Sequence, residues 1–130
     1  MSHLAAYAVT VVVFLVVDAV WLKLVMRPLF ERFVGHMLLD DPRLGVAAGF
    51  YALYCVGLLY FAAIPATEPG GGGVPAALRD GALLGVFAYG TYEATNYATL
   101  KGWNWRMVAV DVAWGTVLSA VSAAAGALVL

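Results

Sequence analysis

Three carboxylic acids stand inside apolar stretches of the chain: Asp18, Glu93 and Asp111. The other five acidic residues lie in or beside more polar segments. An ionisable group inside a bilayer costs about 2.5–3.5 kcal/mol on insertion scales, so it is a functional hypothesis by default. Two carboxylates a few ångströms apart in a low-dielectric medium cannot both be ionised at little cost. Such a group could therefore exchange a proton, act as a general acid or base, or capture a cation.

Glu93 belongs to a polar stripe in an otherwise apolar segment. Such a stripe in a membrane helix should face the bundle interior or a water-filled cavity rather than lipid. At 100° per residue, one helical face carries Tyr89, Tyr92, Glu93, Asn96 and Thr99.

Asp18 and Asp111 occur in a shared local phrase, each with a tryptophan three residues later. Val17-Asp18-Ala19-Val20-Trp21 and Val110-Asp111-Val112-Ala113-Trp114 are the two copies. Residues three apart stack on the same face of a helix. An approximate symmetry between the two segments is one interpretation. Trp21 and Trp114 could line a pocket, and packing near the membrane interface is the alternative.

The sequence supports two interpretations of the three carboxylates equally. One is a structural role, and the other is a role in ligand binding, proton exchange or catalysis. They could accept hydrogen bonds from Tyr, Trp, Thr or Asn across helices. They could also pair with Lys23, Lys101 or Arg106, whose long side chains can reach back from the membrane rim.

The composition predicts the kind of secondary structure in which these residues lie. The 130-residue chain is 64% hydrophobic and 12% charged, whereas soluble domains carry about 25% charged residues. A chain this small cannot hide so much apolar surface in a core, so lipid must be its solvent. We therefore expect an all-α fold, an integral membrane four-helix bundle in a single transmembrane domain over residues 1–130. Its spans are expected at about 4–26, 44–64, 78–100 and 107–130.

The connectors between these spans differ in character. The first, residues 27–43, has apolar side chains at helical spacing and favours a short amphipathic helix in the interface between spans 1 and 2. The second, from Pro65 to Ala77, contains a run of four glycines and predicts a mobile loop. The third, from Lys101 to Arg106, predicts a tight turn with interfacial Trp103 and Trp105.

Small residues mark the faces where helices could approach closely. Gly90, Ala94 and Ala98 form such a face in the third span. The fourth span carries a second set: Gly115, Ser119, Ser122 and Gly126.

The distribution of cations predicts the orientation. The first and third connectors with their adjoining helix ends carry six of the seven Lys and Arg residues, and the opposite side has Arg79 alone. Positive charge stays in the cytoplasm, so both termini are expected outside it and the three carboxylates in the cytoplasmic half.

Several classes of site find no support in the sequence. The single cysteine, Cys55, rules out an internal disulfide or a Cys-pair metal site and reads as a small buried hydrophobe. His36 has no second ligand type at useful spacing, so no metal is expected. The net charge of −1 suggests no nucleic-acid partner. No particular cofactor is indicated.

One stretch carries a resemblance to a known family. Residues 89–103, YGTYEATNYATLKGW, and 110–116, VDVAWGT, resemble an uncharacterised family of small bacterial membrane proteins. Residues 50–54, FYALY, with Gly57, and Asp18 with Trp21, resemble the same family's earlier signatures. Glu93 stands where that family would most often place aspartate. The resemblance implies a four-span protein of the bacterial inner (plasma) membrane and implies no established activity.

Three functions remain open from the sequence. The first is a binding or transport unit, perhaps a homo-oligomer, for a cation, proton or small amphiphile. The second is a structural or accessory subunit of a larger membrane complex. The third, a lipid-modifying enzyme, lacks a histidine cluster or a nucleophile pattern to support it. The candidate site of the first comprises Asp18, Trp21, Tyr89, Tyr92, Glu93, Asn96, Asp111 and Trp114.

Overall fold

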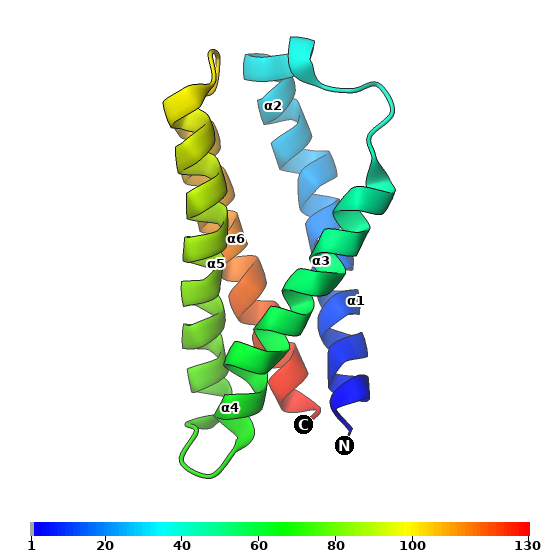
Figure 1. Ribbon diagram of the computed structural model, residues 1–130, viewed down its shortest axis with the longest axis vertical. Helices are drawn as coiled ribbons and strands as arrows, with labels where there is room; N and C mark the ends of the chain where they lie inside the picture. The colour runs from blue at the N-terminus through cyan, green and yellow to red at the C-terminus, as the bar shows by residue number, and fades with distance from the viewer. Residues whose placement is uncertain (1) are drawn as a thin grey trace.

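The structure is a computed structural model that describes residues 2–130. In this range it consists of helices and short connections, with no strand. Four long helical segments form a bundle, which confirms the predicted fold class (Figure 1). Three of them, within residues 3–37, 44–67 and 105–128, are long and apolar enough to cross a membrane. The third segment in chain order is less apolar and is not among them, so its role as a span remains a prediction.

The first segment is one nearly continuous helix. It comprises α1 (His3–Trp21), a π-helical stretch at Leu22–Met26 and α2 (Arg27–Val34), followed by a 3-10 turn at Gly35–Met37. The expected amphipathic helix is therefore present as α2. It is not separate, because it continues the first span without a break.

The second segment repeats this design. It comprises α3 (Leu44–Leu58), a π-helical stretch at Leu59–Ala63 and α4 (Ile64–Thr67). The prediction of a loop from Pro65 to Ala77 is wrong in extent. Both ends of this range are helical, and only residues 68–72 connect α4 to the next helix.

Each π-helical stretch ends two residues before a proline, Pro28 or Pro65, which lies in the first turn of the helix that follows. A proline lacks the N–H that a helix needs, and its ring collides with the carbonyl four residues earlier. A widened turn accommodates both effects, so the chain stays helical where the sequence suggested an end.

The last two segments, α5 (Gly73–Thr99) and α6 (Trp105–Leu128), make the most extensive helix contact of the fold. A Cβ added to Gly81 would lie 2.7 Å from the Ser119 carbonyl oxygen, and one at Gly85 would meet the Gly115 backbone. The small-residue face of α6 therefore packs as predicted. The face predicted on α5 does not: nothing lies within 4 Å of a Cβ at Gly90, and Ala94 and Ala98 are exposed.

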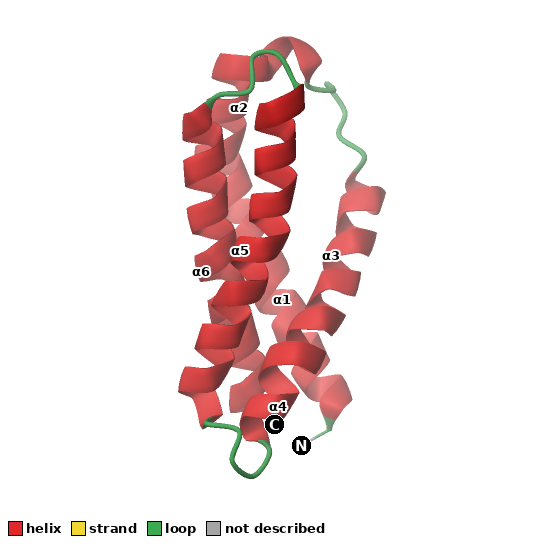
Figure 2. Ribbon diagram, turned by 60° about the vertical axis from the view of Figure 1, so that its left-hand side comes forward, coloured by secondary structure: helices red, strands yellow, loops and turns green. Residues whose placement is uncertain are grey.

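The ends of the bundle are unlike. Both termini and the turn at residues 68–72 lie at one end, and α2 and the α5–α6 connection lie at the other (Figures 1 and 2). α3 packs against α1, but its N-terminal half leans away from α5 (Figures 1 and 2). The second segment contacts α5 chiefly through Leu59–Ala63 and α4. The bundle is therefore closed near the termini and open between α3 and α5 at the other end.

Candidate functional site

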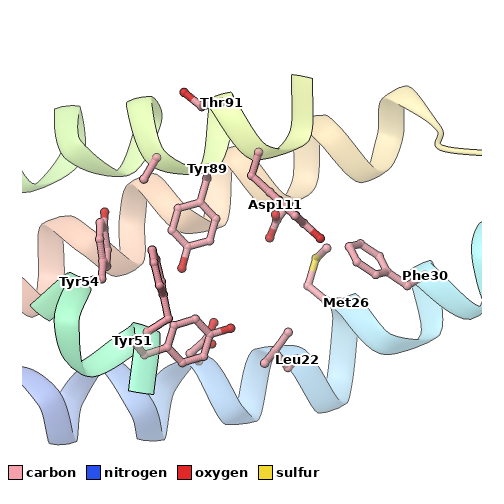
Figure 3. Close-up of a pocket in the computed structure, with 12 residues that line it drawn as sticks. Leu22, Met26, Phe30, Tyr51, Tyr54, Tyr89, Thr91 and Asp111 are labelled. Carbon is pink, nitrogen blue, oxygen red and sulfur yellow. The ribbon is translucent and has the colours of Figure 1, made fainter. Parts of the chain in front are cut away.

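A cavity of about 690 Å³ lies where α3 and α5 separate (Figure 3). This volume falls within the range of about 300–1,000 Å³ that is usual for small-molecule sites. The cavity opens outward beside Phe50 and Tyr92, which remain 65% and 52% exposed. Its polar lining consists of two carboxylates, four tyrosines and a threonine: Asp18, Asp111, Tyr51, Tyr54, Tyr89, Tyr92 and Thr91.

Asp18 reaches the cavity from α1 and is only 4% exposed. Its Oδ1 accepts a hydrogen bond from the indole Nε1 of Trp114 at 3.3 Å. The Tyr51 hydroxyl of α3 lies beside the same carboxyl group. Asp18 is thus held by one neutral donor from α6, and a hydroxyl group from α3 lies next to it.

Asp111 reaches the cavity from α6 and touches a second acid. Its carboxyl group interacts directly with that of Glu93 on α5. Glu93 is fully buried and does not line the cavity, so it lies behind Asp111. Its Oε1 accepts a hydrogen bond from Trp103 Nε1 at 2.9 Å, and its Oε2 has no hydrogen-bond partner among residues 2–130.

None of the three carboxylates is compensated by a cation in the part of the chain that the structure describes. The ion pairs there are Arg27–Glu31 and Arg79–Asp80, so the alternative pairing with Lys23, Lys101 or Arg106 is not formed. No group of three His, Cys, Asp or Glu side chains within residues 2–130 could hold a metal ion. Asp18, Glu93 and Asp111 gather in one region of the bundle.

The two Asp–Trp phrases meet across the bundle. The Trp21 and Trp114 rings stack at 4.2 Å between centroids with an interplanar angle of 8°. The contact is not symmetrical, because Trp114 donates to Asp18 while the buried Nε1 of Trp21 has no partner in the described chain. The stacked rings lie outside the large cavity and line a separate apolar depression of about 280 Å³.

The tyrosines of the wall are positioned by neighbouring side chains. The Phe14 ring packs against Tyr51 and Tyr54 at 5.4 and 5.7 Å between centroids. The Tyr54 hydroxyl and Ser119 Oγ share a hydrogen bond of 2.8 Å. Tyr89 lies over the backbone at Gly115, where a Cβ would collide with its ring. The cavity therefore has a preorganised aromatic wall.

The predicted site residues divide into three groups. Asp18, Tyr89, Tyr92 and Asp111 line the cavity, and Glu93 and Trp114 each contact one of its carboxylates. Trp21 and Asn96 do not reach it: Trp21 packs on Trp114, and Asn96 lies beside Tyr92.

Sequence reasoning missed other members of the site. Trp103, expected as an interfacial belt residue, instead donates to Glu93, and its ring packs against Phe30 at 5.2 Å between centroids. Tyr51 and Met26 also line the cavity without having been expected there. The sequence offered one signal for the contact between Trp103 and Glu93. This tryptophan lies in a tight turn ten residues after an acid in an apolar segment.

Taken together, the fold and the site define a helical membrane protein with uncompensated carboxylates around an aromatic cavity. Residues 3–128 match the family described as "Predicted membrane protein (DUF2177)", and the chain belongs to this family. A search of the curated proteins finds no match, and neither does a search of the solved structures.

Proposed function

We propose that this protein binds a small cationic amphiphile in the cavity between α3 and α5. The observation that carries the proposal is the pair of carboxylates, Asp18 and Asp111, which face an open cavity without a cationic partner in residues 2–130. A buried charge is normally paired or neutralised, because desolvation is costly. A ligand with a positive head group would supply the missing partner.

The aromatic wall supports a cation over a neutral or anionic ligand. Tyr51, Tyr54, Tyr89 and Tyr92 present ring surfaces around the two carboxylates. Aromatic faces attract ammonium and related cations, most strongly where water is excluded. The apolar side chains of Leu22, Met26, Phe30 and Phe50 would accompany a hydrocarbon or aromatic tail.

The position of the opening supports entry from the bilayer. The cavity opens beside Phe50 and Tyr92 on the long sides of α3 and α5. If α5 also spans the membrane, as its 27-residue length allows, this opening faces lipid. With both termini outside the cytoplasm, the cavity then lies in the cytoplasmic half of the inner membrane. Transport would need a second conformation open to the other side, so binding is the step that we propose here.

Equilibrium binding of tetraphenylphosphonium to the protein in lipid nanodiscs tests the proposal. We expect saturable binding above that of empty nanodiscs, and no saturable binding of tetraphenylborate, which has the same shape and the opposite charge. Asp18→Asn and Asp111→Asn should each weaken the phosphonium affinity by roughly tenfold or more, about 1.4 kcal/mol.

Asp80→Asn is the matched control, because Asp80 is already paired with Arg79 near the other end of α5 and does not line the cavity. Its phosphonium affinity should equal that of the wild type. Absence of saturable phosphonium binding, or binding that both cavity variants leave unchanged, would contradict the proposal.

A further inference from the structure

We propose that Glu93 and Asp111 share one proton in the empty site, and that the incoming cation displaces it to the aqueous phase. The inference rests on the proposed function and concerns how that site keeps its charge balanced. It assigns Glu93 the role of a proton holder and leaves contact with the ligand to Asp18 and Asp111.

The contact between two acids is the first step of the argument. A carboxylate oxygen can only accept a hydrogen bond, whereas a protonated carboxyl group can also donate one. The Asp111 and Glu93 carboxyl groups interact directly, and Glu93 Oε2 is buried without a donor from residues 2–130. One proton between the two groups satisfies this oxygen and removes the repulsion between two neighbouring charges.

No Lys, Arg or His side chain of residues 2–130 forms an ion pair with Glu93 or Asp111. The hydrogen bond that Glu93 does receive comes from the neutral Trp103 indole. The remaining titratable groups that face the pair are one acid and three tyrosines, which carry no positive charge in any protonation state. They are Asp18 from α1, Tyr51 from α3, and Tyr89 and Tyr92 from α5.

The position of Asp111 between the cavity and Glu93 couples cation binding to proton release. Asp111 contacts the cavity on one side and Glu93 on the other, while Glu93 is shut off from the cavity. A cation beside Asp111 stabilises the ionised form of the pair and therefore favours release of its proton. The exchange is balanced, because one positive charge enters the site and one leaves.

The structure also indicates where the proton would leave. Trp103 lies in the connection between α5 and α6, at the end of the bundle (Figure 1). Its ring is held by Phe30 and Tyr92 at 5.2 and 6.1 Å between centroids. It is partly exposed while it donates to Glu93. Trp103 thus connects the buried Glu93 carboxyl group to the partly exposed end of the bundle.

Proton counting during ligand binding tests the inference. Tetraphenylphosphonium is added to the wild-type protein in nanodiscs in weakly buffered solution with a pH indicator. We expect about one proton released per cation bound, and an affinity that falls up to tenfold for each pH unit of acidification. Infrared difference spectra should show a protonated carboxyl band that disappears when the cation binds.

Glu93→Gln is the matched variant, because its amide oxygen can still accept from Trp103 and its amide group can donate to Asp111. This variant should bind the cation without releasing a proton, should lack the carboxyl band, and should show a flatter dependence of affinity on pH. The wild-type proton count needs no variant, so the test holds even if Glu93→Gln fails to fold.

The outcomes separate the two proposals. Saturable binding by the wild type without proton release would overturn the inference and leave the proposed function standing. Proton release that persists unchanged in a folded Glu93→Gln variant would also overturn it. Absence of saturable cation binding would overturn both.

Discussion

The two sides of the bundle are built on opposite principles. Where α5 meets α6, glycines bring the backbones so close that no Cβ fits at Gly81 or Gly85. Where α3 faces α5, large aromatic side chains surround a cavity of about 690 Å³. In the first region the side chains are minimal and the helices touch. In the second they are bulky and the helices separate.

This difference assigns the two regions different tasks. Close contact of small residues gives dispersion and backbone packing, which stabilise helix pairs in lipid. It fixes the positions of Glu93 on α5 and Asp111 on α6, which interact directly. In the open region the helices pack less closely, and a ligand can enter the cavity from outside the bundle. We infer that α5 and α6 form the scaffold and that α3 contributes one wall of the open site.

A large residue in the scaffold should have the largest effect. Gly85→Leu should lower the free energy of unfolding by about 1–3 kcal/mol, because the side chain would collide with the α6 backbone. Gly90→Leu, in the same helix, should have little effect, because nothing lies within 4 Å of its Cβ position. Denaturant unfolding in detergent measures both. Equal losses in the two variants would show that α5 and α6 do not pack as described.

Added bulk on the open side should affect binding and not stability. Ala88→Phe would fill part of the cavity, since Ala88 lines it, and should weaken tetraphenylphosphonium affinity by roughly tenfold. Its stability should stay within about 0.5 kcal/mol of the wild type, because the side chain is exposed. Ala94→Phe is the control, exposed on the same helix but outside the cavity. Unchanged affinity in Ala88→Phe would place the ligand elsewhere.

The hydrogen bond from Trp114 on α6 to Asp18 in the cavity can be removed by substitution. Trp114→Phe retains an aromatic ring against Trp21 and removes the donor to Asp18. The loss should be about 1–1.5 kcal/mol of stability, as for a hydrogen bond removed from a buried group. Trp105→Phe, at a 59% exposed position, should be neutral in the same unfolding measurement. A neutral Trp114→Phe would mean that this hydrogen bond does not support Asp18.

The smallest effect is expected at Tyr54. Tyr54→Phe removes the hydrogen bond to Ser119 while keeping the ring, and should cost about 1 kcal/mol of stability. Tyr60→Phe, at a 66% exposed position, is the control and should cost nothing. If the two variants unfold alike, α3 is not tied to α6 at this point.

The sequence predicted the parts of the molecule that depend on one helix at a time. Long apolar segments predicted the four-helix fold. The face that carries Tyr89, Tyr92, Glu93, Asn96 and Thr99 predicted an inward polar stripe, which is only partly correct because Thr99 is exposed. Glu93 is buried as that pattern required, while Tyr92 stands at the cavity opening. These features follow from hydropathy and helical period alone.

Features that depend on two helices were not predictable in the same way. The sequence of α5 contains small residues on more than one face. Only the position of α6 determines that Gly81 and Gly85 are packed while Gly90 is not. The continuation of helix through Pro28 and Pro65 depends on π-helical turns, and a proline in the sequence does not by itself distinguish such a turn from the end of a helix. The contact of Trp103 with Glu93 depends on the fold of a turn.

Photolabelling tests the central claim most directly. A phosphonium cation that carries a diazirine is dissolved in the lipid of nanodiscs, irradiated with the protein, and the labelled residues are mapped by mass spectrometry. We predict labels on the cavity residues of α3 and α5, around Tyr51 and Tyr89, that unlabelled tetraphenylphosphonium removes by competition. Competed labels confined to the apolar depression around Val20 and Leu24, or no competed label at all, would contradict the account.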